Sequence, residues 1–206
     1  MTDQKTQRVV LASGNRGKLK EFQYLLSGAG FDVLPQSEFD VCDADETGLS
    51  FVENAIIKAR HACQLTGLPA IADDSGLEVD ALLGKPGIYS SRFAGVDGGD
   101  KDAANNQKLL NSLEGLSQSE RTARFQCVLV YMRHADDPTP LICQGSWEGL
   151  ILHQAAGEGG FGYDPLFFVP EKNCASAQLD KADKNAISHR GKAMQKLLDL
   201  LKSTPL

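Results

Sequence analysis

The segment from Ser13 to Lys18 combines residue types that suit the binding of an anion. Its sequence is Ser-Gly-Asn-Arg-Gly-Lys, and it follows the short apolar run Val9–Ala12. An apolar strand that ends at a polar, glycine-containing turn before a helix directs backbone N–H groups to one place, where a phosphate can bind. The spacing differs from the Walker A motif, because no Ser or Thr follows Lys18. A tight strand-to-helix turn without a ligand has the same composition, so the loop alone leaves both interpretations open.

Two adjacent carboxylates, Asp73 and Asp74, follow the short apolar segment Ala70–Ala72. We expect that segment to be a buried strand, which would place both acids at its carboxyl end. Carboxylates at such a position repel each other and lose hydration, and a bound Mg²⁺ would relieve both effects. The alternative is a solvated turn after the strand.

A second acidic group lies earlier in the chain and comprises Asp43, Asp45, Glu46 and Glu53. One of these acids could complete a metal site with Asp74. The helix dipole also favours acids at the start of a helix, so each of them has a structural explanation as well.

Two later segments supply groups for a planar base and for a charged ligand. Glycines in Gly157–Pro165 would let the backbone approach a ligand closely, and Phe161 and Tyr163 could stack on a base. The segment Lys184–Lys192 contains Ser188 as a candidate helix cap, with basic side chains that can donate to phosphate or to a carbonyl oxygen. The structural alternatives are a glycine-rich turn with a core aromatic residue and a solvated basic helix end.

Apolar periodicity predicts the elements that would hold these groups. The expected strands are 8–12, 31–35, 70–72, 77–82, 122–134, 141–147 with 149–153 as a continuation, and 166–169. The expected helices are 18–27, a helix from the capping box at Ser50 and Glu53 to about Gly67, 103–113 after a polar loop at 95–100, and a last helix through Ala193 and Leu201. Early strand–helix alternation followed by antiparallel strands predicts an α/β fold with a mixed central sheet and flanking helices.

Length and composition fit one domain, residues 1–206, with two lobes and a cleft between them. The net charge of −6 argues against a nucleic-acid partner. We expect no membrane partner, since no apolar stretch approaches the roughly 20 residues that span a bilayer and the N-terminus does not resemble a signal peptide. The five cysteines are widely spaced, which is typical of reduced thiols and predicts a cytoplasmic protein.

Taken together, these segments resemble the inosine/xanthosine triphosphate pyrophosphatase family, and its bacterial branch in particular. The matching segments run in the family's order and cover nearly the whole chain. They are Ser13–Lys18 with Glu21, Glu46–Gly48 with Phe51 and Glu53–Ala55, Ala72–Leu77, Pro86–Arg92, Gly160–Pro165 and Ser188–Arg190. The departures are small: Ser13 stands where threonine is commoner, and Asp45-Glu46 stands where two glutamates are frequent.

The resemblance implies a two-lobed α/β fold with the nucleotide in the cleft, and a homodimer. It implies Mg²⁺-dependent hydrolysis of a purine nucleoside triphosphate to the monophosphate and pyrophosphate, with ITP, dITP and XTP as preferred substrates. Asp74 would be the general base, and Asp74 with Asp45 or Glu46 would hold the metal ion. The residues implied in substrate binding are Ser13, Gly14, Asn15, Arg16, Gly17, Lys18, Ser75, Phe161, Gly162, Tyr163, Asp164, Lys184, His189 and Arg190.

In this hypothesis the Ser13–Lys18 loop would hold the triphosphate, and water would attack the α-phosphorus. The pair His189-Arg190 would donate to the 6-keto oxygen of hypoxanthine or xanthine, whereas the 6-amino group of adenine would leave those donors unmatched. Whether Asp74 acts as base, as ligand or as both stays open, and so does the feature that rejects GTP.

Two other functions fit the same residues. One is a Maf-type pyrophosphatase for other modified nucleotides, against which the pair His189-Arg190 argues. The other is a nucleotide-binding regulator that does not hydrolyse its ligand. The adjacent Asp73 and Asp74 argue against a regulator, because a pure binder has little use for a base beside a metal ion.

Overall fold

The computed structural model describes residues 6–96 and 100–203, and these residues form two compact units. Within the described ranges, unit 1 consists of the residues up to Asp74, Val128–Gln144 and the residues from Ala193 on, and unit 2 consists of Ser75–Cys127 and Gly145–Lys192. The chain passes between the units within three strands and one helix. Neither unit is therefore a continuous piece of sequence.

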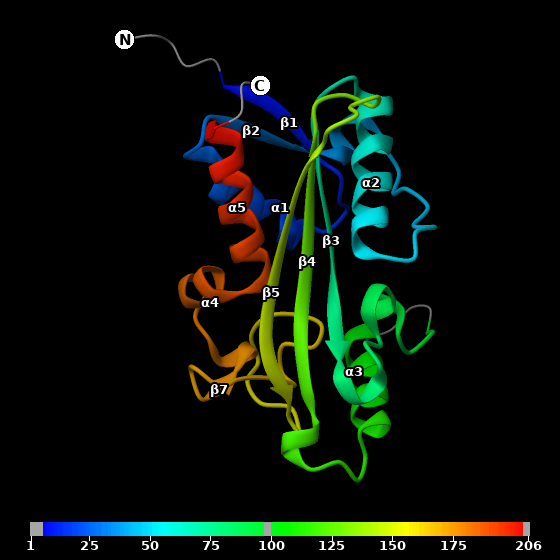
Figure 1. The fold of residues 1–206 in the computed structure, drawn as a ribbon, viewed down its shortest axis with the longest axis vertical. Helices are drawn as coiled ribbons and strands as arrows, with labels where there is room; N and C mark the ends of the chain where they lie inside the picture. Colours follow the sequence, from blue (N-terminus) through cyan, green and yellow to red (C-terminus); the bar gives the residue numbers. More distant parts are fainter. Residues whose placement is uncertain (1–5, 97–99, 204–206) are drawn as a thin grey trace. The chain divides into compact units, whose positions relative to one another are not determined.

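Figure 1 shows the strands and helices that the described residues form. In chain order they are β1 (Gln7–Leu11), α1 (Arg16–Ser27), β2 (Phe31–Pro35), α2 (Phe51–Thr66), β3 (Ala70–Val79), α3 (Lys101–Ser112), β4 (Thr122–Met132), β5 (Leu141–Ile151), β6 (Phe167–Val169), β7 (Cys174–Ala175), α4 (Lys181–Ile187) and α5 (His189–Ser203). The strand order in the sheet is β2-β1-β3-β4-β5-β6-β7. Because β1 pairs in parallel with β2 and β3 while β6 pairs antiparallel with β5 and β7, the predicted mixed α/β fold is confirmed.

In unit 1, helices cover both faces of the sheet (Figure 1). Val10 of β1 belongs to one core cluster with Ala55, Ala59 and other residues on the apolar stripe of α2. Successive side chains of a strand point to opposite faces, so the buried Val9 and Leu11 face the side where α1 and α5 lie. A strand that is buried on both faces needs apolar residues at consecutive positions, which explains the continuous apolar run in β1.

The bounds of α2 follow from its caps. The Ser50 hydroxyl accepts a hydrogen bond from the Glu53 N–H, and the Glu53 carboxylate accepts one from that hydroxyl and one from the Leu49 N–H. At the other end Gly67 has a left-handed φ of 67°, and its N–H donates back into the helix. The predicted cap at Ser50 and the glycine stop are confirmed, and the Glu53 carboxylate reaches back to the Leu49 N–H. The two caps fix the position of the helix that carries Lys58.

Aromatic rings fill the core of unit 2. Phe125, Trp147 and Phe167 pack together, with ring centroids 4.5 Å to 6.4 Å apart. Leu109 and Leu113, in and just after α3, belong to the same cluster. This core supports the two segments of unit 2 that the sequence predicts to bind a ligand.

The interpretation of residues 70–82 as two short strands is wrong. β3 runs unbroken from Ala70 to Val79, so Asp73 and Asp74 lie inside a strand and not at its carboxyl end. The polar residues interrupt the apolar pattern, but the strand continues because both carboxylates find cationic partners.

Helix α4 is absent from the prediction, because its polar sequence has no apolar period. Asp180 caps it by accepting a hydrogen bond from the Asp183 N–H. The predicted polar loop at 95–100 includes residues 97–99, which lie outside the described residues.

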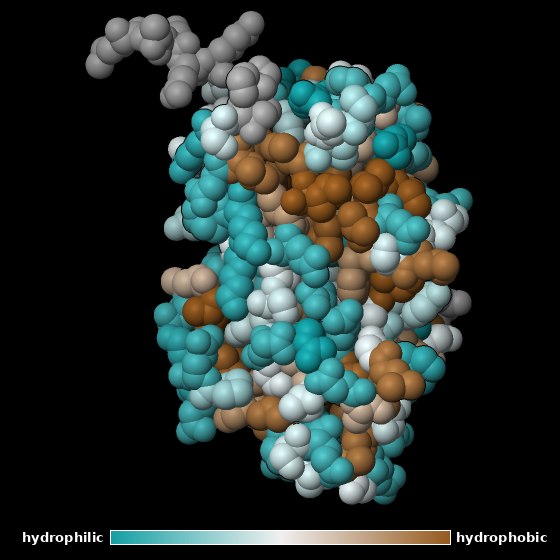
Figure 2. Space-filling model, in the orientation of Figure 1, coloured by the Kyte–Doolittle hydropathy of each residue, from teal (hydrophilic) through white to brown (hydrophobic). Residues whose placement is uncertain are grey.

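Hydrophilic residues cover most of the face shown in Figure 2, and hydrophobic residues gather over the upper ends of β4 and β5. Ile142 of β5 is one exposed apolar side chain of unit 1. Within the described ranges, none of the helices has the length and apolar character that crossing a bilayer requires.

Candidate functional site

The loop after β1 forms the start of α1, and Asn15 caps that helix. The Asn15 side-chain oxygen accepts hydrogen bonds from the N–H groups of Gly17, at 2.8 Å, and Lys18, at 3.1 Å. The Ser13 hydroxyl accepts another from the Asn15 N–H at 3.2 Å. Three N–H groups of the predicted phosphate loop therefore have partners inside the loop, so a phosphate would have to replace the side chains that now accept from them. The side chain of Arg16 lies outside the described part of the structure.

The same loop contacts the first acidic segment. A Cβ atom at Gly14 would lie 3.5 Å from both carboxylate oxygens of Asp43, which is ordinary van der Waals contact. The Asp43 carboxylate also accepts a hydrogen bond from Gln36. The loop and the segment that precedes α2 are thus neighbours in unit 1, as a shared site would require.

Lys18 is paired with a carboxylate of the sheet. Its Nζ atom donates a hydrogen bond to Asp73 Oδ1 and forms an ion pair with it. Asp73 is 1% exposed, and burial of a charged carboxylate at that level requires a charged or hydrogen-bonding partner. The side chain predicted to bind an anion therefore does so here, and the anion is Asp73.

A second lysine, Lys58 of α2, lies between two further carboxylates. Its Nζ atom donates to Asp74 Oδ1 at 2.7 Å and to Glu46 Oε1 at 3.2 Å. Asp74 is 7% exposed, and its other oxygen, Oδ2, is buried without a hydrogen-bond partner among the described residues. The structure therefore brings the predicted Asp74 and Glu46 together around one cationic atom.

The pKa values of this group reflect burial and charge together. Burial raises the pKa of Asp74 above its ordinary value, and Lys58 offsets only part of that effect. Burial lowers the pKa of Lys58, but the carboxylates of Asp74 and Glu46 outweigh it, so the net pKa is raised. Lys58 is therefore a stable cation in this site, and the Asp74 carboxylate is more basic than that of an ordinary aspartate.

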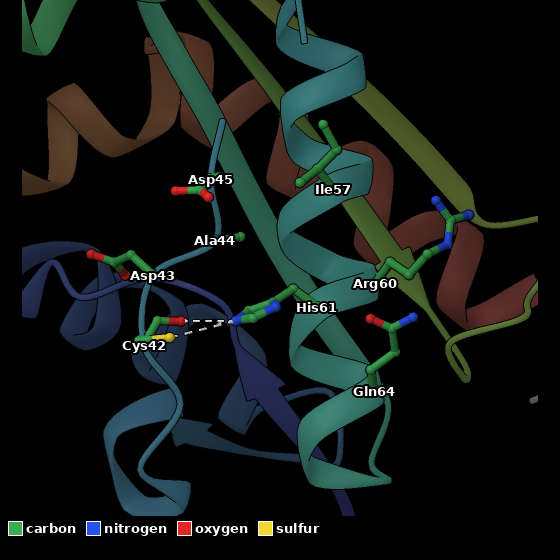
Figure 3. Close-up of a pocket in the computed structure, with 8 residues that line it drawn as sticks. All are labelled: Cys42, Asp43, Ala44, Asp45, Ile57, Arg60, His61 and Gln64. Carbon is green, nitrogen blue, oxygen red and sulfur yellow. Dashed lines mark hydrogen bonds between the residues drawn. The ribbon is translucent and has the colours of Figure 1, made fainter. Parts of the chain in front are cut away.

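Asp45 lies in a different environment from Glu46. It lines a pocket of about 490 Å³ with Cys42, Asp43 and His61, among other residues (Figure 3). In that view the carboxylates of Asp43 and Asp45 point away from α2, whereas the His61 ring faces Cys42, whose carbonyl oxygen lies 3.1 Å from His61 Nε2. Among residues 6–96 and 100–203, no group of three or more His, Cys, Asp or Glu side chains could by itself hold a metal ion.

The glycine-rich segment of unit 2 has only one of its two aromatic rings exposed. Phe161 is 52% exposed, and Lys184 Nζ lies 5.7 Å from the centre of its ring. Tyr163 is 4% exposed, and its hydroxyl donates to the Ser90 carbonyl oxygen at 2.8 Å. The predicted stacking role of Tyr163 is corrected accordingly, because its ring is part of the core.

Asp164 holds the glycine-rich segment in place. Its carboxylate accepts hydrogen bonds from the Phe161 N–H at 2.9 Å, from the Ser176 hydroxyl at 2.9 Å and from Lys184 Nζ at 2.5 Å. A Cβ atom at Gly160 would lie 2.1 Å from the same carboxylate, so only glycine fits there. Asp164 and Lys184 were both predicted to contact a ligand, and here they pair with each other.

The start of α5 places two buried basic side chains in unit 2. The Ser188 hydroxyl accepts a hydrogen bond from the Gly191 N–H, which confirms the predicted helix cap. The His189 ring stacks on Phe125, with centroids 4.8 Å apart and planes at 17°. Arg190 is 5% exposed, and one of its terminal nitrogens donates to the Ser75 hydroxyl at 3.2 Å. The structure therefore brings Ser75 and Arg190, both predicted binding residues, together.

Sequence reasoning missed Lys58. A lysine in an amphipathic helix ordinarily belongs to the solvated face, and that reading hides it. The available signal was its position between Ala55 and Ala59, next to Ile57 and close to the apolar stripe of the helix. The acidic residues elsewhere in the chain were candidate partners for a lysine at such a position. The side chain is only 14% exposed.

The fold and these two groups of residues define a mixed α/β protein with a buried, lysine-neutralised acidic centre in unit 1 and a glycine–aromatic loop beside a basic helix start in unit 2. Comparison with known proteins identifies the particular family. The sequence model of the Ham1 family matches residues 9–200, and the chain belongs to that family.

Individual relatives agree with this assignment over almost their whole length. The chain is 64% identical over 195 residues to the dITP/XTP pyrophosphatase of Photobacterium profundum, covering 95% of this chain and 98% of that protein. It is 62% identical over 190 residues to the dITP/XTP pyrophosphatase of Vibrio cholerae, covering 92% of this chain and 94% of that protein. Among solved structures, a HAM1 protein from Coxiella burnetii superposes with a TM-score of 0.90 at 51% identity, covering 96% of this chain and 100% of that one.

Proposed function

We propose that this chain is a dITP/XTP pyrophosphatase, which hydrolyses non-standard purine nucleoside triphosphates such as dITP, XTP and ITP to the monophosphate and pyrophosphate. One observation carries the proposal: the chain is 64% identical, over 95% of its length, to a protein named for that activity. The acidic centre around Lys58 supports it, because cleavage of a phosphoanhydride needs charged groups that are already in place.

Asp74 is the proposed general base. Its Oδ2 atom is buried and has no hydrogen-bond partner among the described residues, so it is available to accept a proton from an attacking water. Burial raises its pKa, and a carboxylate with a raised pKa is a stronger base near neutral pH. Attack at the α-phosphorus would release pyrophosphate.

Mg²⁺ is the proposed cofactor, and the residues present fit it. Asp74 and Glu46 already share one cationic atom, Lys58 Nζ, and Mg²⁺ needs only one or two protein carboxylates when substrate phosphates supply the other oxygens. This arrangement favours Glu46 over Asp45 as the second carboxylate. When bound, the ion would neutralise charge on the phosphate oxygens.

The remaining proposed roles concern the triphosphate and the base of the nucleotide. Lys18 and the start of α1 would bind the triphosphate, since both provide positive charge. Phe161 would stack on the base, and the pair His189-Arg190 would favour a 6-keto purine. A homodimer and a cytoplasmic location belong to the same proposal, and they rest on the family resemblance.

The test is a substrate panel. Pyrophosphate release is measured with Mg²⁺ and dITP, XTP, ITP, GTP or ATP, and we expect the first three to be cleaved at least about 100-fold more efficiently than ATP. Cleavage that prefers modified pyrimidine nucleotides would favour the Maf-type alternative, and binding without release would favour a regulator.

The variant Asp74→Asn should reduce kcat by about 1,000-fold while the protein stays folded, because the amide cannot accept the proton. The matched control is Asp32→Asn, on the exposed side of β2, which should leave the rate unchanged. An Asp74→Asn variant with near-normal turnover would remove Asp74 from the mechanism.

A further inference from the structure

Two side chains of helix α3 form hydrogen bonds with the backbone N–H and carbonyl groups of Gly162, in the glycine-rich segment. Asp102 Oδ2 accepts a hydrogen bond from the Gly162 N–H at 2.7 Å. Asn106 Nδ2 donates to the Gly162 carbonyl oxygen at 2.9 Å. Asp102 and Asn106 are four residues apart, so they share one face of the helix and reach the same glycine.

These hydrogen bonds restrain a segment that would otherwise be conformationally free. Gly160 and Gly162 have φ values of +79° and +61°, in the left-handed region where glycine is favoured. Glycines lose more conformational freedom on ordering than other residues, so a free segment of this composition would sample many conformations. Bonds from α3 remove that freedom next to Phe161, the exposed ring of the segment.

The side chains of Asp102 and Asn106 contribute little to the hydrophobic core. Leu109 and Leu113 anchor α3 in the core cluster of unit 2, and neither Asp102 nor Asn106 belongs to it. The Asn106 Oδ1 atom is buried without a hydrogen-bond partner among the described residues, which is a cost to the folded state. A side chain selected only for stability would avoid the cost of an unpaired buried oxygen. The hydrogen bonds to Gly162 therefore call for another explanation.

We infer that Asp102 and Asn106 are positioning residues for the purine base. They hold Gly162, which fixes the orientation of the neighbouring Phe161 ring before substrate arrives. Binding then loses less conformational entropy, because the platform for the base is already ordered. The inference rests on the proposed function, in which Phe161 stacks on the base of the nucleotide.

The experiment compares ligands that report on the two ends of the nucleotide. Variants Asp102→Ala and Asn106→Ala are assayed for dITP hydrolysis, with dIMP and inorganic tripolyphosphate as competitive inhibitors. We expect KM for dITP and the inhibition constant of dIMP to rise about tenfold in each variant. We expect kcat and the inhibition constant of tripolyphosphate to change less than twofold, because the loss is one of base binding.

Two further variants separate positioning from a general disturbance of α3. Asp102→Asn keeps an oxygen that can accept from Gly162 N–H, so it should restore KM to within about twofold of wild type. Gln107→Ala removes the neighbouring amide, which donates a hydrogen bond to Asn111 on the exposed side of the same helix, and should change neither constant.

Several results would overturn the inference. One is an unchanged KM in both alanine variants, and another is an equal rise in the inhibition constants of dIMP and tripolyphosphate. If Asp102→Ala lowers the melting temperature strongly, Asn106→Ala decides the question alone. Failure of the wild-type protein to hydrolyse dITP would contradict the proposed function instead. Calorimetric titration of the wild type and the variants with dIMP would then still test whether Asp102 and Asn106 support binding of the base.

Discussion

At the scale of single residues, the acidic centre works by pairing each buried carboxylate with a lysine. Lys18 pairs with Asp73, and Lys58 pairs with Asp74 and Glu46. Ion pairs with this little exposure are weak evidence for stability, because desolvation offsets much of their attraction. Their placement beside a carboxylate oxygen that has no partner among the described residues suits a site that handles charge.

Removal of Lys58 tests that interpretation. In Lys58→Met the carboxylates of Asp74 and Glu46 lose their shared cation, so the pKa of Asp74 should rise further and kcat/KM for dITP should fall by roughly 100-fold. The variant should also be less stable, since it leaves a buried carboxylate without its partner. Pyrophosphate release and thermal unfolding measure the two effects.

A double variant separates them. Lys58→Met combined with Asp74→Asn removes the uncompensated charge, so thermal stability should return in part while activity stays lost. The matched control is Lys172→Met, which breaks the exposed pair with Asp183 and should leave activity within twofold. Full activity in Lys58→Met would show that its contacts are only structural.

The surroundings of a side chain were predictable where chemistry and spacing agreed, and were not where tertiary packing decides them. Asp74, Ser75 and Arg190 lie in polar clusters of the kind that their sequence context predicts. Tyr163 fits a stacking role by type alone, but its ring is buried and its hydroxyl bonds to Ser90. Lys58 shows the reverse case, because nothing in a helical pattern distinguishes a buried lysine from a solvated one.

At the scale of elements, local signals explain most boundaries. The caps at Ser50 and Gly67 define α2, and the predicted strand 31–35 coincides with β2. The exception is β3, where Asp73 and Asp74 break the apolar pattern within a continuous strand. A sequence pattern records side chains of one segment, whereas this strand depends on lysines from α1 and α2.

The turn between β4 and β5 offers an element-scale prediction. The Asp137 carboxylate accepts hydrogen bonds from the Arg133 N–H at 3.0 Å, from the Arg133 guanidinium and from the Thr139 N–H at 3.0 Å. Asp137 is 2% exposed, so Asp137→Asn should destabilise the protein by about 1–3 kcal/mol in urea unfolding at pH 7. The matched control is the adjacent, exposed Asp136→Asn, which should change stability by less than about 0.5 kcal/mol.

The same carboxylate predicts an acid dependence. Hydrogen bonds from Arg133 hold the pKa of Asp137 well below its ordinary value, although burial opposes them. A group whose pKa is lower in the folded state contributes stability above its unfolded pKa of about 3.9, and loses that contribution as the pH falls toward the folded value. The difference between wild type and Asp137→Asn should therefore shrink between pH 5 and pH 3. A difference that is constant over that range would contradict this origin.

At the scale of the whole molecule, chain connectivity joins the two units. β3, β4, β5 and α5 each begin in one unit and end in the other. A strand that loses its packing in one unit loses part of its support in the other, since both parts belong to one hydrogen-bonded element. This connectivity predicts that the two units unfold together.

Two probes can test that prediction. Trp147, the only tryptophan, is buried in unit 2 and reports by fluorescence. Cys63 is buried in unit 1, and burial raises the pKa of its thiol to about 11, so a thiol reagent at pH 8 should modify it only after unfolding. Labelling of Cys63, identified by mass spectrometry, and Trp147 fluorescence should give the same urea midpoint.

A substitution confined to unit 2 makes the test sharper. A Cβ atom at Gly149 would lie 2.5 Å from the Phe168 carbonyl oxygen, so Gly149→Ala should strain the β5–β6 contact and lower stability. If the units unfold together, the midpoint for Cys63 labelling in unit 1 should fall by the same amount as the midpoint for Trp147. A fall at Trp147 alone would show that the shared strands do not make the two units cooperative. In that case the acidic centre of unit 1 would keep its stability when the glycine-rich segment of unit 2 is unfolded.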